Sequence, residues 1–238
     1  MEQRPLERRA SVRTAVVWEA CQARLAAAPA QNVLDIGGGT GGFAVRVAEL
    51  GHRVTVVDPS PDALAALGRR AAERGVDDLV VAQQGDLAGL ADLVAPGSAD
   101  LVLCHDVLGL VDDPGAGLDA IAAALRPGGG LSLLVSQLHA AVLARAMAGH
   151  FAQAKETLGG GTTGERRFAA EEIATLLGDH GFTLEETHAV RVFTDLVPST
   201  LLDLEPGAVG GLLDLERAVA SRPEYRTLAA QLHLLATR

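Results

Sequence analysis

The chain has 238 residues, 48% of them hydrophobic and only 3% aromatic, so it can bury a largely aliphatic core within one domain. The 20 Lys and Arg against 30 Asp and Glu give a net charge of −10, which argues against nonspecific nucleic-acid binding by the whole surface. No apolar run reaches the roughly 18 residues of a membrane helix, no signal peptide begins the chain, and Cys21 and Cys104 lack metal-site spacing. We therefore expect a cytoplasmic protein with neither a membrane nor a metal partner.

The first 30 residues predict a helix, because Val12, Val16 and Val17 recur close to helical period before Pro29 ends the pattern. Arg13 has two interpretations. It either points into a ligand cleft or is an ordinary solvated helix arginine, and spacing alone favours the second.

Residues 32–36 predict a strand that ends in a glycine-rich turn and continues into a helix at about 41–50. Gly37, Gly39 and Gly42 satisfy the GxGxxG fingerprint of dinucleotide sites. Glycines let a ligand approach the main chain, and the free N–H groups of the following helix attract negative or polar ligand atoms. We expect a nucleotide-like ligand at this turn.

Asp35, at the end of that strand, favours one ligand class. A carboxylate there would repel the pyrophosphate of a dinucleotide, whereas S-adenosylmethionine carries a sulfonium and an ammonium that an acid suits. Asp58 follows the second strand, 54–57, at the right distance to accept both ribose hydroxyls.

Two further strand ends carry polar side chains. Gly85 and Asp86 follow the third strand, 79–82, where Asp86 either accepts the adenine amino group or caps a helix over 87–94. His105 follows the fourth strand, 101–104, where the methyl group of that ligand would lie, although a structural histidine fits equally well.

The alternation of strands and helices predicts an α/β fold, a Rossmann-like, doubly wound, seven-stranded and mostly parallel sheet with helices on both faces. A last antiparallel pair would complete it. We divide one domain, 1–238, into four segments, listed in order: an N-terminal helical cap (1–30), a cofactor-binding core (31–136), a helical or lid segment (137–180), and C-terminal strands with a helix (181–238). The glycine run 159–164 is either a mobile lid or a plain surface loop.

The pattern from Asp35 to Gly41 and the turn Arg126-Pro127-Gly128-Gly129 resemble class I S-adenosylmethionine-dependent methyltransferases. Three more motifs make the chain similar to one group, the bacterial tRNA 5-carboxymethoxyuridine methyltransferases: Ala148-Gly149-His150-Phe151, Val190-Arg191-Val192-Phe193 and Arg222-Pro223-Glu224-Tyr225. The resemblance implies methylation of the carboxylate of a modified wobble uridine in tRNA, with S-adenosylmethionine as cofactor. The resemblance also implies which residues bind the cofactor, namely Arg13, Gly37, Gly38, Asp58, Gly85, Asp86 and His105.

The acceptor side is less constrained. Gln137 stands where the family has an asparagine, Arg191 is a candidate for binding an anionic substrate, and Tyr225 either contacts substrate or closes the core. An ionised carboxylate needs no general base, whereas a hydroxyl or amine would need one, for which His105 and His139 are candidates.

Three alternatives stay open at this point. The net acidity and scarcity of lysine favour a small-molecule methyltransferase. A nicotinamide-dependent oxidoreductase would use the same glycines but is opposed by Asp35. A cofactor-binding protein without catalysis is the third.

Overall fold

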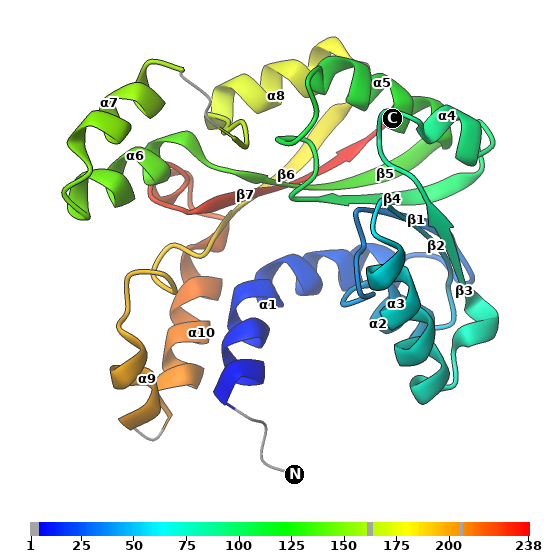
Figure 1. The fold of residues 1–238 in the computed structure, drawn as a ribbon, viewed down its shortest axis with the longest axis horizontal. Helices are drawn as coiled ribbons and strands as arrows, with labels where there is room; N and C mark the ends of the chain where they lie inside the picture. Colours follow the sequence, from blue (N-terminus) through cyan, green and yellow to red (C-terminus); the bar gives the residue numbers. More distant parts are fainter. Residues whose placement is uncertain (1–4, 161–163, 205–206) are drawn as a thin grey trace.

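The structure, a computed structural model, describes residues 5–160, 164–204 and 207–238. These residues form a seven-stranded sheet in the order β3-β2-β1-β4-β5-β7-β6. The strands are β1 Asn32–Ile36, β2 Arg53–Asp58, β3 Val80–Gln84, β4 Ala99–His105, β5 Leu125–Ser136, β6 Thr183–Val190 and β7 Gln231–Thr237. The prediction of seven strands in an α/β fold is confirmed (Figure 1).

The sheet is mixed rather than mostly parallel. Strands β1 to β5 pair in parallel, whereas β7 inserts between β5 and β6 and runs antiparallel to both. The reason lies in the connections. The first strands are joined by crossovers that return the chain to the same end of the sheet, and β7 enters the sheet from the opposite end.

Helices cover both faces, as expected. The helices are α1 Pro5–Leu25, α2 Ala44–Glu49, α3 Pro61–Arg74, α4 Leu90–Leu93, α5 Pro114–Ala124, α6 Leu138–Met147, α7 Phe151–Leu158, α8 Ala170–Asp179, α9 Ser199–Leu204 and α10 Ala208–Ala220, with 3-10 turns η1 Asp77–Leu79 and η2 Pro223–Tyr225. One core joins the sheet to α4, α5 and α8, and a second joins the other face to α1, α2 and α3. No helix in the described ranges is long and apolar enough to cross a membrane.

Local sequence signals explain where several helices begin and end. Ser60 accepts a hydrogen bond from the Ala63 N–H at the start of α3, and Gly75 ends that helix with a left-handed φ of 67°. The predicted helical stretch 137–158 is two helices, α6 and α7, because Gly149 takes a left-handed φ of 78° between them. Helix α9 was not predicted. The lid-or-loop segment 159–164 includes residues 161–163, which lie outside the described residues.

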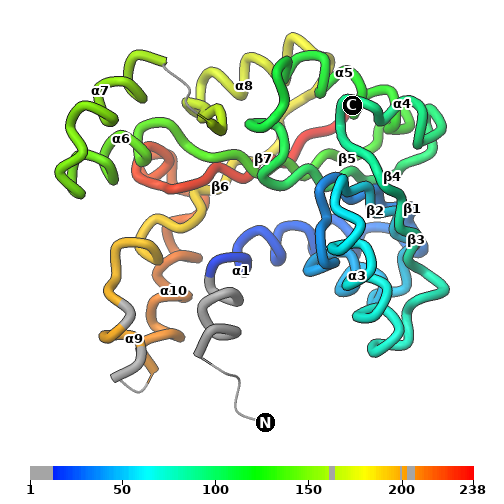
Figure 2. Tube along the Cα trace, viewed as in Figure 1, coloured from blue at the N-terminus to red at the C-terminus, as the bar shows by residue number. Residues whose placement is uncertain are grey.

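Two helices that are far apart in the sequence pack together on one face of the sheet. Helices α1 and α10 lie side by side there (Figure 2), and Arg217 of α10 donates to both carboxylate oxygens of Glu19 on α1 at 2.6–3.1 Å. This contact fixes α1 across the strands whose ends carry the predicted site.

Candidate cofactor and acceptor site

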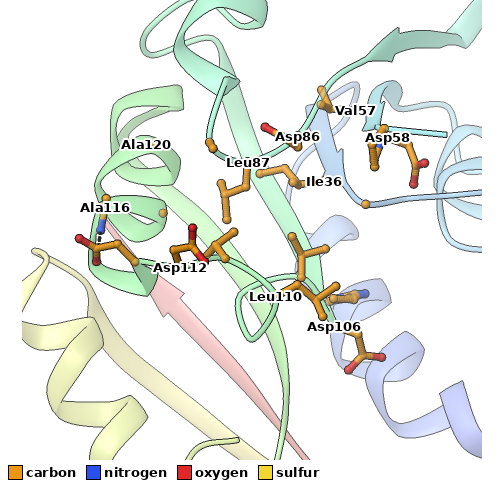
Figure 3. A pocket seen from close by; sticks show the side chains of 18 residues that line it. Ile36, Val57, Asp58, Asp86, Leu87, Asp106, Leu110, Asp112, Ala116 and Ala120 are labelled. Carbon is orange, nitrogen blue, oxygen red and sulfur yellow. Dashed lines mark hydrogen bonds between the residues drawn. The ribbon is translucent and has the colours of Figure 1, made fainter. Parts of the chain in front are cut away.

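A pocket of about 880 Å³ lies outside the carboxyl ends of the parallel strands (Figure 3). The predicted residues Gly37, Asp58, Asp86 and His105 line it, together with Asp106 and an apolar wall from α5 and the preceding loop. This is the position at which open α/β sheets bind ligands.

The glycine turn fits tightly beneath this pocket. Gly37 has a left-handed φ of 72°, and a Cβ there would lie 2.3 Å from Cγ2 of Val107. A Cβ on Gly38 would lie 2.5 Å from Oδ2 of Asp35. Gly39 also has a left-handed φ, of 54°. Gly37 is therefore required for both its backbone conformation and its packing, Gly38 for packing alone, and Gly39 for its conformation.

Asp35 is a buried acid whose carboxyl group is incompletely hydrogen-bonded within the described residues. Its carboxyl group is 3% exposed, and Oδ2 has no hydrogen-bond partner among the described residues. Burial, and then the nearby Asp58, raise the pKa of Asp35 to about 7. A cationic ligand would satisfy this group, so the site fits S-adenosylmethionine and opposes a pyrophosphate.

Asp58 is held rigidly by the backbone around it. Its Oδ2 accepts the Gly39 N–H and its Oδ1 accepts the Ser60 N–H, both at 2.9 Å. Each carboxylate oxygen can accept a second hydrogen bond. Asp58 can therefore still accept hydrogen bonds from ribose hydroxyls while the two backbone N–H groups fix its orientation.

Asp86 lies on the pocket and also bonds to the backbone just before α4. It lines the pocket, and its Oδ1 accepts the Gly89 N–H at 3.0 Å just before α4. Gly85 lies outside the pocket wall, and a Cβ there would be 2.3 Å from Cδ1 of Leu93. Gly85 thus allows α4 to pack closely and set the position of Asp86.

His105 lies at the end of β4 against two other side chains. Its Nε2 is 2.9 Å from Oγ of Ser132, and its ring meets the edge of Phe43 at a centroid distance of 4.9 Å. Burial lowers the pKa of His105 to about 4, so the imidazole is neutral at physiological pH.

Gln137 and His139 are bonded to one another at the start of α6. The Gln137 side chain caps that helix by accepting the Ala140 N–H at 2.7 Å, and its Nε2 lies 3.0 Å from Nδ1 of His139. Gln137 also lines a second pocket, of about 230 Å³, whereas His139 lines neither this pocket nor the first.

Arg191 lines the second pocket with Arg167 and Phe193. Its guanidinium donates to Gln231 Oε1 at 3.1 Å and to Asp195. Its backbone has a left-handed φ of 60°, a conformation that non-glycine residues rarely adopt.

Arg13 and Tyr225 lie away from the first pocket. Arg13 forms an ion pair with Asp195 at 3.1 Å and lines a third pocket together with Arg191. Tyr225 packs edge-on against Phe193 at 6.1 Å, in a small cluster between β6 and α10.

Sequence reasoning missed the residues that link the first and second pockets. Asp106, on the first pocket, has a left-handed φ of 58° and accepts the Gln231 side-chain N–H at 2.6 Å. Gln231 in turn accepts from Arg191, so one buried amide bridges the two pockets. Position at a strand end could have indicated Asp106, but nothing in the sequence singles out Gln231.

Comparison with known proteins agrees with this site. A family model described as a methyltransferase domain matches residues 12–187. The chain is 29% identical over 240 residues to the tRNA 5-carboxymethoxyuridine methyltransferase of Escherichia coli K12, covering 95% of this chain and 88% of that protein. It is 37% identical over 119 residues to a ubiquinone biosynthesis O-methyltransferase of Xanthomonas euvesicatoria, about half of either chain.

Solved structures show the same fold. An S-adenosylmethionine-dependent methyltransferase from Mesorhizobium loti superposes with a TM-score of 0.65 at 20% identity, covering 93% of this chain and 97% of that one. The 1,6-didemethyltoxoflavin-N1-methyltransferase of Burkholderia thailandensis gives a TM-score of 0.58 at 22% identity, over 96% and 78% of the two chains. The chain belongs to the methyltransferase domain family and is an enzyme whose methyl donor is S-adenosylmethionine.

Proposed function

We propose that this methyltransferase esterifies the carboxylate of a modified wobble uridine, 5-carboxymethoxyuridine, in tRNA. One observation supports the proposal most. The similarity to the Escherichia coli enzyme of that name extends over 95% of the chain, whereas the similarity to the Xanthomonas O-methyltransferase covers half. The C-terminal half, which carries the acceptor-side residues, therefore has a counterpart in the first relative.

The second pocket supports an anionic acceptor. Its walls are mostly apolar, from Ala140, Leu143 and Phe193, and two arginines, Arg167 and Arg191, reach it. A flat base fits against such walls, and a guanidinium binds a carboxylate through paired hydrogen bonds.

The side-chain amide of Gln231, which bridges the two pockets, suggests how the acceptor is aligned with the donor. Gln231 is 6% exposed and holds both Arg191, beside the acceptor, and Asp106, beside the methyl donor. Alignment of this kind can supply about 7–11 kcal/mol of catalysis. In this assignment Asp35, Asp58 and Asp86 hold the donor, while Arg191 holds the acceptor.

Small-molecule methylation is the second candidate, and the ion pairs that many arginines form with acidic side chains favour it. Many guanidinium groups are already paired with acids, as in Arg24–Glu185, Arg126–Asp100 and Arg217–Glu19. Paired arginines contribute less to phosphate binding, which together with the net charge of −10 weakens the case for a large RNA surface.

The test is a methylation assay with labelled S-adenosylmethionine and tRNA from a strain that lacks its own enzyme for this ester. We expect the methyl ester of 5-carboxymethoxyuridine among the digested nucleosides, and no product from tRNA that lacks the carboxymethoxy group. Gln231→Leu should raise KM for tRNA with little change in donor affinity, and Arg126→Gln is the matched surface control. Label in a small metabolite of a cell extract, and none in tRNA, would favour the second candidate.

A further inference from the structure

Asp195 joins two arginines at the wall between the second and third pockets. Its Oδ1 accepts a hydrogen bond from Arg13 at 3.1 Å, and its Oδ2 accepts one from Nη2 of Arg191. Asp195 and Arg191 each line both pockets. A carboxylate of the protein itself is therefore bound to the arginine that the proposed function assigns to the carboxylate of the acceptor.

The backbone on either side of Asp195 is held in place. Glu216 of α10 is 1% exposed, and its carboxylate accepts the three successive N–H groups of residues 192–194 at 2.8–3.0 Å. The carbonyl oxygen of Phe193 then accepts the N–H groups of residues 196–197 at 2.8 and 3.0 Å. Because the main chain is fixed before and after Asp195, its carboxylate can move by rotation of the side chain alone.

Arg191 is itself fixed at two points. Nη1 of its guanidinium donates to Oε1 of Gln231 at 3.1 Å, and its backbone has a left-handed φ of 60° directly after β6. The side chain of Arg13 is, by contrast, 54% exposed. When the contacts of Asp195 change, we therefore expect Arg191 to stay in place and Asp195 to keep its bond to Arg13.

One donor of Arg191 is unused. Its Nε is buried and has no hydrogen-bond partner among the described residues. In a guanidinium, Nε–H and one N–H of Nη2 lie side by side on one edge, and together they fit the two oxygens of a carboxylate. Asp195 binds this edge through Nη2 alone. A carboxylate that replaced Asp195 and bonded to both donors would satisfy a buried N–H that Asp195 leaves unpaired.

The charge of the second pocket suits an acceptor that changes its own charge. Among the described residues, the charged side chains that line this pocket are Arg167, Arg191 and Asp195, two cations and one anion, with a sum of +1. An ionised carboxylate brings that sum to zero, whereas its methyl ester leaves it at +1. Substrate and product therefore differ in how well they compete with Asp195 for Arg191.

We propose that Asp195 exchanges with the acceptor carboxylate on Arg191 in each turnover and thereby promotes release of the methyl ester. The proposal rests on the proposed function and adds to it the residue that replaces the product. In the free enzyme Asp195 is bound to Nη2 of Arg191. The ionised acceptor displaces it by bonding to both Nε and Nη2. Asp195 is a positioning residue, because it acts through Arg191 and does not contact the reacting atoms.

Methyl transfer itself reverses the exchange. The acceptor oxygen forms a bond to the methyl carbon while the carbon–sulfur bond of the donor breaks toward sulfur, so the acceptor loses its negative charge. The neutral ester then offers Arg191 a carbonyl oxygen, which accepts a weaker hydrogen bond than a carboxylate does. Asp195 remains charged and within reach, so it returns to Nη2 and the ester leaves.

A purely structural ion pair would behave differently. If Asp195 only held Arg191 in position, its removal would free the guanidinium and weaken the binding of an acceptor carboxylate. If Asp195 competes for Arg191, its removal should strengthen that binding. The two roles thus predict opposite changes in the same dissociation constant.

The first experiment measures the binding of phenoxyacetate, a flat ring that carries a carboxymethoxy group, to the enzyme saturated with S-adenosylhomocysteine. Asp195→Asn should lower its Kd about threefold, as expected for the loss of a partly exposed competing ion pair, and Asp195→Ala should act in the same direction. Asp214→Asn is the matched control and should leave Kd unchanged, because Asp214 pairs with Arg217 at 3.2 Å and lines none of the pockets described above. An unchanged or higher Kd in the two Asp195 variants would overturn the exchange.

NMR of 15N-labelled arginine side chains reads the contact itself in the same titration. The Nε–H signal of Arg191, assigned by its loss in Arg191→Gln, should shift much further with phenoxyacetate than with neutral methyl phenoxyacetate. If phenoxyacetate binds and this signal does not respond, the carboxylate binds elsewhere and the proposal is wrong.

The second experiment follows turnover with tRNA. Asp195→Asn should raise kcat/KM for tRNA about threefold and should strengthen inhibition by the methylated product, because the ester no longer loses Arg191 to Asp195. A structural defect would instead lower kcat/KM. If tRNA is not methylated but Asp195→Asn binds phenoxyacetate more tightly, the proposed function fails and the exchange stands. If tRNA is methylated and product inhibition is no stronger in Asp195→Asn, the exchange fails and the proposed function stands.

Discussion

Replacing Asp35 by Asn tests the central claim that this buried acid of the cofactor site binds the positively charged methyl donor. The pKa of Asp35 is raised from 3.8 to about 7, chiefly by burial. At about 1.36 kcal/mol per pH unit, this corresponds to roughly 4 kcal/mol of lost folding stability once the carboxyl is ionised in both states. Asn has nearly the same shape and carries no charge.

The direction in which pH changes the free energy of unfolding follows from the protonation equilibria of Asp35 in the folded and the unfolded chain. Below a pH of about 3.8 the carboxyl is protonated in the folded and the unfolded chain, so its contribution to stability is fully present. As pH rises to about 7 only the unfolded chain loses the proton, and stability falls. Asp35→Asn should therefore match the wild type at low pH and exceed it by up to about 4 kcal/mol above pH 7.

The affinity for the donor should change with pH in the opposite direction to the folding stability. S-adenosylmethionine brings positive charge to the Asp35 carboxylate, so the wild type should bind it more tightly as pH rises through about 7. Asp35→Asn should weaken binding at least about tenfold and lose this pH dependence.

The assay is urea unfolding of the free proteins from about pH 4 to pH 8, with isothermal titration of S-adenosylmethionine over the same range. Asp78→Asn, an exposed acid on η1, is the control and should change neither curve. A variant that unfolds like the wild type at high pH and binds the donor equally well would refute the reasoning.

Three further substitutions test the packing around the site. Gly38→Ala should abolish donor binding and lower the melting temperature, because its Cβ would lie 2.5 Å from Oδ2 of Asp35; normal titration by the donor would contradict this. Phe168→Ala should cost about 3–5 kcal/mol in urea unfolding, since this ring is fully buried in the core beneath α8. Asp113→Ala should cost about 1 kcal/mol, because this side chain accepts two N–H groups at the start of α5, and a loss below about 0.3 kcal/mol would count against that capping role.

Much of the donor side of the site was predictable from the chain. Each of Asp35, Asp58, Asp86 and His105 follows an apolar run, and parallel strands bring their carboxyl ends to one edge. Three of the four line one pocket, whereas Asp35 is buried and does not line it. Local pattern suffices here because strand direction alone decides which residues meet.

The acceptor side was less predictable, because it depends on how helices are oriented. Arg13 was expected to reach the cofactor cleft, but the path of α1 beside α10 brings it to Asp195. Tyr225 could not be placed either, since its partner Phe193 lies in the irregular segment after β6. Neither helix direction nor loop path is encoded in periodicity.

Polar contacts across the sheet, from His105 through Ser132 to His233, depend on information that lies still further from local sequence. His233 and His188 become neighbours of His105 only because β7 inserts between β5 and β6 with one particular register. A slip of one residue in β7 would turn His233 to the opposite face, toward the core of α5 and α8, and leave Ser132 without its acceptor. The antiparallel insertion that departs from a mostly parallel sheet is thus what joins the first pocket to the sheet edge. The same register places Gln231 between Asp106 and Arg191, so one strand sets both the polar contacts across the sheet and the proposed alignment of the acceptor.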